Sequence, residues 1–333
     1  MQKEYQTTQI KYYLDNNKPL DMDTIFTKAH QHLFRMYGDR PDIMDIIPQC
    51  KHRELSNDIK HLISSDITNH DVENYTNNIV SQFRKIEKAG LQTSAGLEFT
   101  RYNPFTRTGR PSNSNKGINY AALNKEDGSR DRFISRFPGG ILADFDFDAY
   151  HLRLICNLID YEPPTESFHK HLGEIYFDTK SITSDQYEES KKITFRILYG
   201  GVPKELESVP YFSAVKDYID SQWISFKDKG YIETPIFKRK LWKKNFDKMN
   251  SQKLFNYMIQ AYETEMNATK LKELFELLDG KDSKMILYTY DSFLFDISPN
   301  DGKPLIKDIQ KVLEYPTSVH IGKNYGNMMN YTG

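Results

Sequence analysis

The chain has 333 residues, and its 45 lysines and arginines nearly balance 46 aspartates and glutamates, giving a formal net charge of −1. This length suits about two domains, and an aromatic content of 13% allows a substantial core and excludes a chain that is disordered throughout. The near-neutral charge argues neither for nor against a nucleic-acid partner, because local patches of charge matter more than their sum.

The two cysteines and the first residues bear on the cellular compartment. Cys50 and Cys156 do not make a disulfide framework, so a reducing compartment is expected, with both side chains packed as small apolar groups. The N-terminal residues lack the apolar stretch of a signal peptide, and no apolar run approaches the length of a membrane span. We therefore expect a soluble, cytoplasmic protein without a membrane partner.

The first hundred residues are predicted to be mostly helical. Apolar side chains recur at helical spacing, and Gly90 follows as a helix stop; these side chains are Val72, Tyr75, Ile79, Phe83 and Ile86. Residues 101–132 are rich in Asn, Ser, Gly, Arg and Pro, which predicts an extended loop with short strands.

An apolar strand carrying aspartates follows at residues 140–148. Because side chains alternate along a strand, Asp144, Asp146 and Asp148 should share one face. Phe145 and Phe147 should then share the other. Carboxylates gathered on a hydrophobic strand are costly without a partner, and the usual partner is a hard cation such as Mg²⁺.

The rest of the chain alternates helical segments with a second aspartate strand. The expected elements are an amphipathic stretch at 149–159, a turn at 162–165, helices in 166–250 interrupted near 200–203 and 230, a long helix at 252–278, a hairpin at 285–296 turning near Tyr290 and Asp291, and a helix and strand in 303–333. Strands from both ends of this region must meet in one sheet around a helical insertion. Two aspartate strands side by side would form a site for two metal ions.

Three segments carry candidate binding residues, and each is weak alone. On a helix, Lys191, Phe195 and Tyr199 lie on one face and could hold a nucleotide, although a core stripe is the alternative. Arg110 stands beside a glycine turn and suits phosphate or base contacts, although surface Arg–Gly loops are common. Residues 227–248 interleave basic and aromatic side chains, which fits either a nucleic-acid track or a solvated face.

Taken together and in order, these segments resemble the family A, polymerase-I-like DNA polymerases. The resemblance covers roughly residues 100–330. Residues 146–153 resemble motif A, residues 191–200 resemble motif B, and residues 290–292 resemble motif C. Three further segments, 105–137, 230–239 and 319–325, are similar to family stretches in the same order, and the overall texture resembles phage or viral members.

The resemblance implies a role for each matching residue. Asp146 and Asp291, with the Phe147 carbonyl, would hold two Mg²⁺ ions, and Lys191 would bind the triphosphate and could protonate the leaving group. The residues implied to form the nucleotide pocket are Lys191, Phe195, Tyr199, His151 and Phe147. The residues implied to contact DNA are Arg110, Asn119, Arg132, Arg239, Gln260 and Tyr290.

Three positions depart from the family pattern. His151 stands where the family has a glutamate that helps to exclude the ribose 2′-hydroxyl, so sugar selection is in question. Tyr187 replaces an arginine expected on the triphosphate, and Ser292 replaces the second carboxylate of motif C.

Neighbouring side chains offer compensation for two of these departures. Lys192 or Arg196 could supply the missing triphosphate contact, and Asp144 or Asp148 could add metal affinity. Asp144 is also the rival of Asp146 as principal metal ligand, and the spacing to the end of motif A favours Asp146.

The resemblance implies a mixed α/β (α+β) fold, a right-hand polymerase with an antiparallel palm sheet. The implied domains are a helical, thumb-like region at 1–100, the first part of the palm at 101–164, helical fingers at 165–250 and the second part of the palm at 251–333. The implied activity is addition of dNTPs to the 3′-hydroxyl of a DNA primer–template. The first hundred residues are expected to be too few to hold a proofreading exonuclease domain. A separate exonuclease or processivity subunit and a phage-infected host cell are compatible with this activity.

Two alternatives stay open. A single-subunit RNA polymerase also has Asp-Ser-Phe in motif C, and His151 favours it, whereas the 230–239 segment and Arg110 with its glycine turn argue against it. A non-catalytic, polymerase-like scaffold that binds nucleic acid is favoured by Tyr187 and Ser292. Retention of both aspartates and Lys191 argues against that scaffold.

Overall fold

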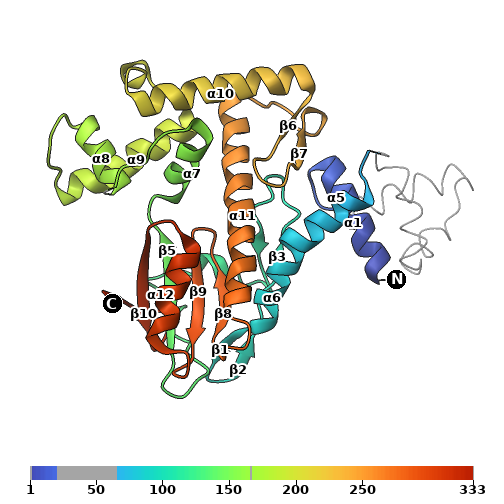
Figure 1. The fold of residues 1–333 in the computed structure, drawn as a ribbon, viewed down its shortest axis with the longest axis vertical. Helices are drawn as coiled ribbons and strands as arrows, with labels where there is room; N and C mark the ends of the chain where they lie inside the picture. Colours follow the sequence, from blue (N-terminus) through green and yellow to red (C-terminus); the bar gives the residue numbers. More distant parts are fainter. Residues whose placement is uncertain (1, 21–65, 166, 333) are drawn as a thin grey trace, which may run out of the picture.

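The computed structural model describes residues 2–20, 66–165 and 167–332, and predictions on residues outside these ranges, including Cys50, are not addressed by it. Figure 1 shows a sheet at one end of the molecule, a group of helices at the other, and α11 (Ser251–Leu277) running between them. None of the helices in the described ranges combines the length and apolarity needed to cross a membrane.

A five-stranded antiparallel sheet forms the base of the fold. Its strands are β5 (Ile141–Phe147), β8 (Lys284–Tyr288), β9 (Ser292–Ile297), β10 (Thr317–Gly322) and β11 (Met329–Asn330), in the order β11-β10-β5-β9-β8. The first aspartate strand lies at the centre, and Asp146 pairs with Ser292 on one side and Ser318 on the other. The predictions of a mixed α/β fold and of two adjacent aspartate strands are confirmed.

The helices between the two halves of the sheet form the upper part of the molecule (Figure 1). They are α7 (Tyr150–Ile159), α8 (Phe168–Tyr176), α9 (Ser184–Gly200), η5 (Lys204–Leu206) and α10 (Pro210–Lys229). A hairpin of β6 (Tyr231–Glu233) and β7 (Lys240–Trp242) follows, and η6 (Lys243–Asn245) leads towards α11. The helical prediction for 166–250 therefore fails at this hairpin, because Gly230 ends α10 at φ +75° and aromatic residues pair across the strands.

The N-terminal part contains helices and short strands along one side of α11. Its helices are α1 (Gln2–Asn16), α5 (Asn69–Tyr75), the π-helical turn η3 (Thr76–Val80) and α6 (Ser81–Ala89), and the five apolar side chains predicted at helical spacing are all buried. Gly90, at φ +66°, ends α6 as predicted. The strands β1 (Leu91–Thr93), β2 (Gly96–Glu98), β3 (Tyr102–Asn103) and β4 (Ser112–Asn113) and the turn η4 (Tyr120–Ala122) follow.

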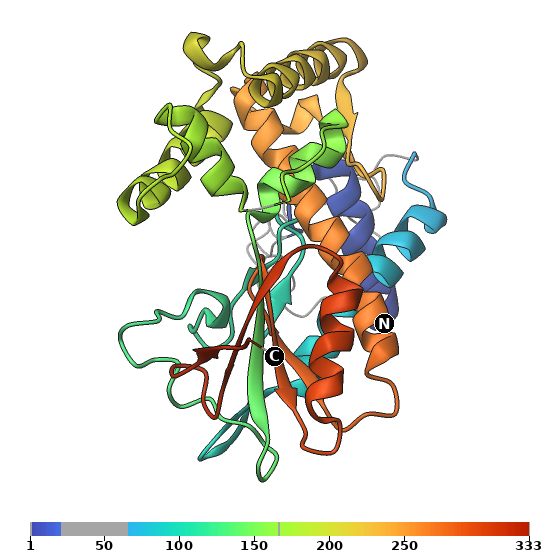
Figure 2. The same ribbon diagram turned by 60° about the vertical axis from the view of Figure 1, so that its left-hand side comes forward.

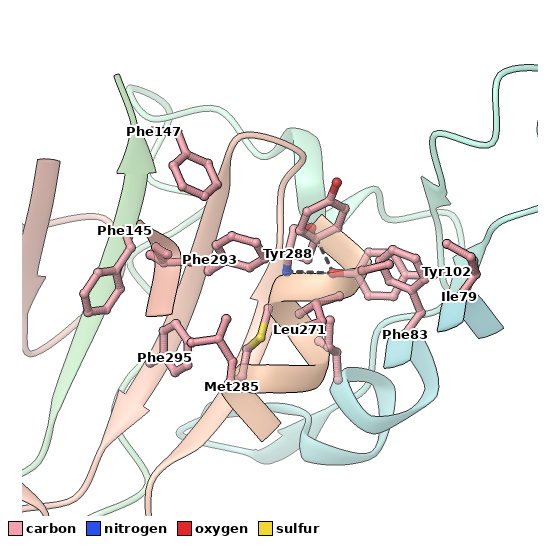
Figure 3. Packing of buried hydrophobic residues seen from close by; sticks show 14 of the residues in the cluster. Ile79, Phe83, Tyr102, Phe145, Phe147, Leu271, Met285, Tyr288, Phe293 and Phe295 are labelled. Carbon is pink, nitrogen blue, oxygen red and sulfur yellow. Dashed lines mark hydrogen bonds between the residues drawn. The ribbon is translucent and has the colours of Figure 1, made fainter. Parts of the chain in front are cut away.

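The two faces of the sheet have different surroundings. Phe145 and Phe147 face the main core, which α6, α11 and α12 (Gly302–Leu313) complete; Figure 2 shows α12 beside α11. Figure 3 shows this core, where the Tyr102 hydroxyl accepts a hydrogen bond from the Tyr288 amide at 2.8 Å and donates one to its carbonyl at 2.9 Å. Each fully buried aromatic or aliphatic side chain contributes about 1.5–3 kcal/mol. The opposite face carries Asp144 and Asp146, as the alternation predicted.

A buried ion pair closes the end of the sheet that lies away from the aspartates. The Asp296 carboxylate of β9 is fully buried and accepts from the Nε of Arg136 at 2.8 Å and from the Ser135 hydroxyl at 2.6 Å. The same guanidinium donates to the carbonyls of Ala89 at 3.0 Å and Gly90 at 2.8 Å. This one side chain therefore joins the end of α6 to the sheet.

Candidate active site

The two predicted aspartates meet where β5 ends and the β8–β9 hairpin turns. The amide of Phe147 donates to the carbonyl of Asp291 at 2.9 Å, so the turn is fastened directly to the end of β5. Tyr290 takes a left-handed conformation at φ +77°, which lets the chain reverse within four residues. Asp146 and Asp291 line the same cleft.

The electrostatics of this corner favour a bound cation. Burial, followed by the neighbouring Asp291 and Asp144 carboxylates, raises the pKa of Asp146 to about 7. Burial also raises the pKa of Asp291, and the Glu263 carboxylate adds to that rise while the Arg110 guanidinium opposes it. Carboxylates that raise each other's pKa are stabilised in the ionised form when a positive charge lies between them.

The donor set fits a hard cation such as Mg²⁺. Asp146 and Asp291 supply carboxylate oxygens, and Phe147 lines the same cleft. Within residues 2–20, 66–165 and 167–332, no group of three or more His, Cys, Asp or Glu side chains is arranged to hold a metal ion. The described residues therefore fit a cation held by two carboxylate side chains, with its other oxygen ligands supplied by groups other than these side chains.

The two other candidate carboxylates have partners within the protein. Asp144 accepts a hydrogen bond from the Ser292 hydroxyl at 2.9 Å and does not line the cleft. Asp148 lines the cleft but lies 3.1 Å from the guanidinium of Arg153. These contacts favour Asp146 over its rival Asp144.

Asp146→Asn is expected to stabilise the metal-free protein at pH 8 by about 1–2 kcal/mol, allowing for partial exposure of the side chain. The folded-state pKa of Asp146 is raised from its ordinary value of 3.8, so the cost that this carboxylate adds to folding is absent below pH 4 and grows as the pH rises towards 7. Thermal unfolding at pH 4 and pH 8 measures the difference, which should approach zero at pH 4. A variant less stable than the wild type at pH 8 would contradict the conclusion that burial and the neighbouring carboxylates disfavour the ionised form of Asp146.

A cleft of about 560 Å³ extends from the aspartates to α9. Its lining brings together four separate segments of the sequence, which contribute Arg110; Asp146, Phe147 and His151; Lys191, Phe195 and Tyr199; and Asp291. The rings of Phe195 and Tyr199 lie parallel at 6.0 Å and are 44% and 36% exposed. This exposure excludes the alternative that they form a core stripe of α9.

The charged groups along α9 divide between the cleft and the outer surface. Lys191 lines the cleft, 4.4 Å above the ring of Tyr187 and 2.9 Å from the Glu188 carboxylate. Lys192 and Arg196 pair with Glu189 and do not line the cleft, so their position does not support the suggested replacement of the missing arginine.

His169 is a cleft residue that sequence reasoning missed. It is buried on α8 beside Tyr187 and Phe195, its Nδ1 has no hydrogen-bond partner, and burial lowers the pKa of its imidazole. Because a buried polar atom is costly without a partner, Nδ1 is a candidate ligand contact. Nothing in the spacing of residues 166–176 distinguishes this histidine from a core residue.

The residues predicted to contact DNA have different surroundings. Asn119 and Arg132 are exposed, with Arg132 paired to Glu98 at 2.9 Å, and Gln260 is half-buried on α11. Arg110 and Tyr290 lie together in a cation–π contact of 4.0 Å.

The position of Arg239 does not suit the DNA contact predicted for it. This side chain is only 7% exposed, its guanidinium donates to the Thr108 carbonyl at 2.7 Å, and it lies 5.5 Å from the ring centre of Tyr13. A side chain buried between the start of β7 and the 106–110 loop packs the interior. This burial supports a structural role, and the DNA contact of Arg239 stays a prediction.

The fold is similar to that of a solved polymerase domain. The chain covers 56% of the solved "POL domain of Pol1 from M. smegmatis complex with DNA primer-template and dNTP", with a TM-score of 0.59 and 17% identity over 92% of its own length. This likeness confirms the predicted fold class.

The sequence is also similar to proteins named DNA polymerase I. The chain is 24% identical to DNA polymerase I of Streptococcus pneumoniae, 22% identical to that of Bacillus subtilis and 21% identical to that of Synechocystis, with matches covering 70%, 76% and 93% of this chain. It spans about a third of these relatives, with 31%, 33% and 34% of their lengths covered. No family model matches the chain.

Proposed function

We propose that this chain is a DNA-directed DNA polymerase that adds dNTPs to the 3′-hydroxyl of a primer paired with a template. The observation that carries this proposal is the meeting of Asp146 and Asp291 with Lys191 and the exposed rings of α9 in one cleft. Likeness to DNA polymerase I in sequence and fold supports it. A protein that only binds nucleic acid would not need two neighbouring carboxylates in one cleft with the positively charged side chain of Lys191.

Asp146 and Asp291, with the Phe147 carbonyl, would hold two Mg²⁺ ions. When bound, such ions lower the pKa of the attacking hydroxyl and neutralise charge on the leaving pyrophosphate. Lys191 would bind the triphosphate and donate a proton to the leaving group. The burial of His169 and its unpaired Nδ1 support a second triphosphate contact on the same side of the cleft.

The aromatic rings of α9 would shape the nucleotide pocket. Phe195 and Tyr199 present parallel faces to the cleft, so a base or sugar can pack against them without a change in their own packing. His151 would lie near the sugar. Because His151 replaces the family's glutamate, selection between a deoxyribose and a ribose sugar is the property of this pocket to test first.

The domain roles follow from this proposal. Residues 101–164 and 251–333 would form the palm, 165–250 the fingers and 1–100 a thumb-like region that grips the duplex. Asn119, Arg132, Gln260 and Tyr290 would contact DNA, with Arg110 beside Tyr290. Phage origin, infected-cell localisation and a separate exonuclease or processivity subunit stay predictions; the relatives named above are bacterial.

Extension of a labelled DNA primer on a DNA template tests the proposal. Wild-type protein with Mg²⁺ and dNTPs should lengthen the primer, and Asp146→Ala should abolish extension. A parallel reaction with rNTPs addresses the RNA polymerase alternative, which His151 keeps open. Extension with rNTPs alone would establish that alternative, and DNA binding without extension in either reaction would favour the scaffold.

A further inference from the structure

A buried carboxylate of the cleft lies close to an arginine and a histidine side chain. Glu263 of α11 is 1% exposed, and its Oε2 lies 2.9 Å from the Nε of Arg110. Its Oε1 lies 3.2 Å from the Nε2 of His151. Burying a carboxylate costs free energy unless charged or polar partners surround it. Both partners of Glu263 come from other segments of the chain.

Each of these partners in turn contacts an aromatic ring. The Arg110 guanidinium lies 4.0 Å from the ring centre of Tyr290, next to Asp291. The His151 Nδ1 lies 2.8 Å from the hydroxyl of Tyr199, at the end of α9. Glu263 is thus linked through Arg110 to Tyr290 and through His151 to Tyr199.

The chemistry of the imidazole indicates which groups donate and which accept along this series of contacts. The Glu263 carboxylate, 3.2 Å from Nε2 of His151, favours the tautomer that carries the proton on Nε2. In the neutral ring Nδ1 is then the acceptor, and the Tyr199 hydroxyl donates to it. The carboxylate thereby selects the tautomer that can hold Tyr199.

We propose that Glu263 is a positioning residue of the nucleotide cleft, acting through His151 on Tyr199 and through Arg110 on Tyr290. The inference rests on the proposed function, because it takes the cleft as the site of dNTP binding. Tyr199 is 36% exposed and its neighbour Phe195 is 44% exposed, so core packing alone does not fix these rings. The polar chain that starts at Glu263 supplies the missing constraint.

Glu263→Gln tests this role, because it keeps the size of the side chain and removes its charge. The rings would lose their fixed position in the ground state, so the KM for dNTP should rise about 10-fold while kcat changes by less than about 3-fold. Steady-state extension of one primer–template gives both constants. Isothermal titration of dATP into the protein–DNA complex should show a matching loss of affinity.

Glu265→Gln is the matched control. Glu265 lies two residues along the same helix, is 3% exposed, and accepts hydrogen bonds from the amides of Ile236 and Phe237 at 3.0 Å, away from the cleft. Both variants should lower the thermal midpoint, and only Glu263→Gln should raise the KM. Equal KM changes in the two variants, or none in Glu263→Gln, would overturn the inference.

Tyr199→Phe supplies a second test, because it removes the hydroxyl and keeps the ring. If Glu263 acts through His151 on this hydroxyl, the double variant should bind dNTP less weakly than the sum of the single effects predicts. Strictly additive effects would overturn the inference. Wild-type extension tests the proposed function by itself, and dATP titration tests Glu263 even in a chain that does not extend primers.

Discussion

Asp291→Ala is expected to slow primer extension at least about 10³-fold, while the affinity for primer–template DNA changes by less than about 2-fold. Asp291 would supply half of the side-chain carboxylates that hold the metal ions, and metal ions provide several kcal/mol of transition-state stabilisation. A loss of 4 kcal/mol corresponds to about a 10³-fold loss in rate. Single-turnover extension gives the rate, and fluorescence anisotropy of labelled DNA gives the affinity.

Asp282→Ala is the control for this experiment. Asp282 is an exposed carboxylate just before β8, does not line the cleft, and accepts a hydrogen bond from Asn300 at 2.7 Å. Its removal should leave the extension rate unchanged. An Asp291→Ala protein that extends primers at the wild-type rate would refute the assignment of the metal site.

Arg136→Ala is expected to lower the free energy of unfolding by about 3–5 kcal/mol, because it leaves the fully buried Asp296 carboxylate without its cation. The variant also loses the two hydrogen bonds that join the guanidinium to the end of α6. Urea denaturation, followed by circular dichroism at pH 7, measures the change.

The double variant Arg136→Ala with Asp296→Ala separates the charge from the packing. Removing both partners takes away the unpaired carboxylate, so the double variant should be more stable than Arg136→Ala alone. A single variant within about 1 kcal/mol of the wild type would show that the Arg136–Asp296 ion pair is not a major source of stability.

The sequence predicted those parts of the fold that depend on local patterns. The alternation in 140–148 placed Asp146 and Phe147 on opposite faces, and the apolar spacing from Val72 to Ile86 predicted buried helices. The β6–β7 hairpin was missed because its strands are three residues each, too short for a period to show. It is held by the Tyr231–Trp242 pair across the strands and by the hydrogen bond that the Trp242 amide donates to Asn17, just after α1, and neither contact is a local signal.

Only those residues of the cleft that belong to sequence motifs were predicted. Asp146, Asp291 and Lys191 carry residue types that suggest metal and phosphate binding, and the structure brings them into one cleft. Glu263 resembled any other charged residue of a long helix, and its contacts with Arg110, 153 positions away, and with His151 distinguish it. Charge type is visible in a sequence, whereas the burial that gives a charge its function depends on distant segments.

The length of α11 is fixed by what its turns contact. Over 27 residues, roughly 40 Å at 1.5 Å per residue, it gives Phe255, Met258 and Leu271 to three different cores and Glu263 to the cleft. Inserting or deleting one residue would turn every later side chain by about 100° and withdraw it from its partners. Changes in chain length can therefore accumulate in connections such as 201–209 or 298–301, but not within this helix.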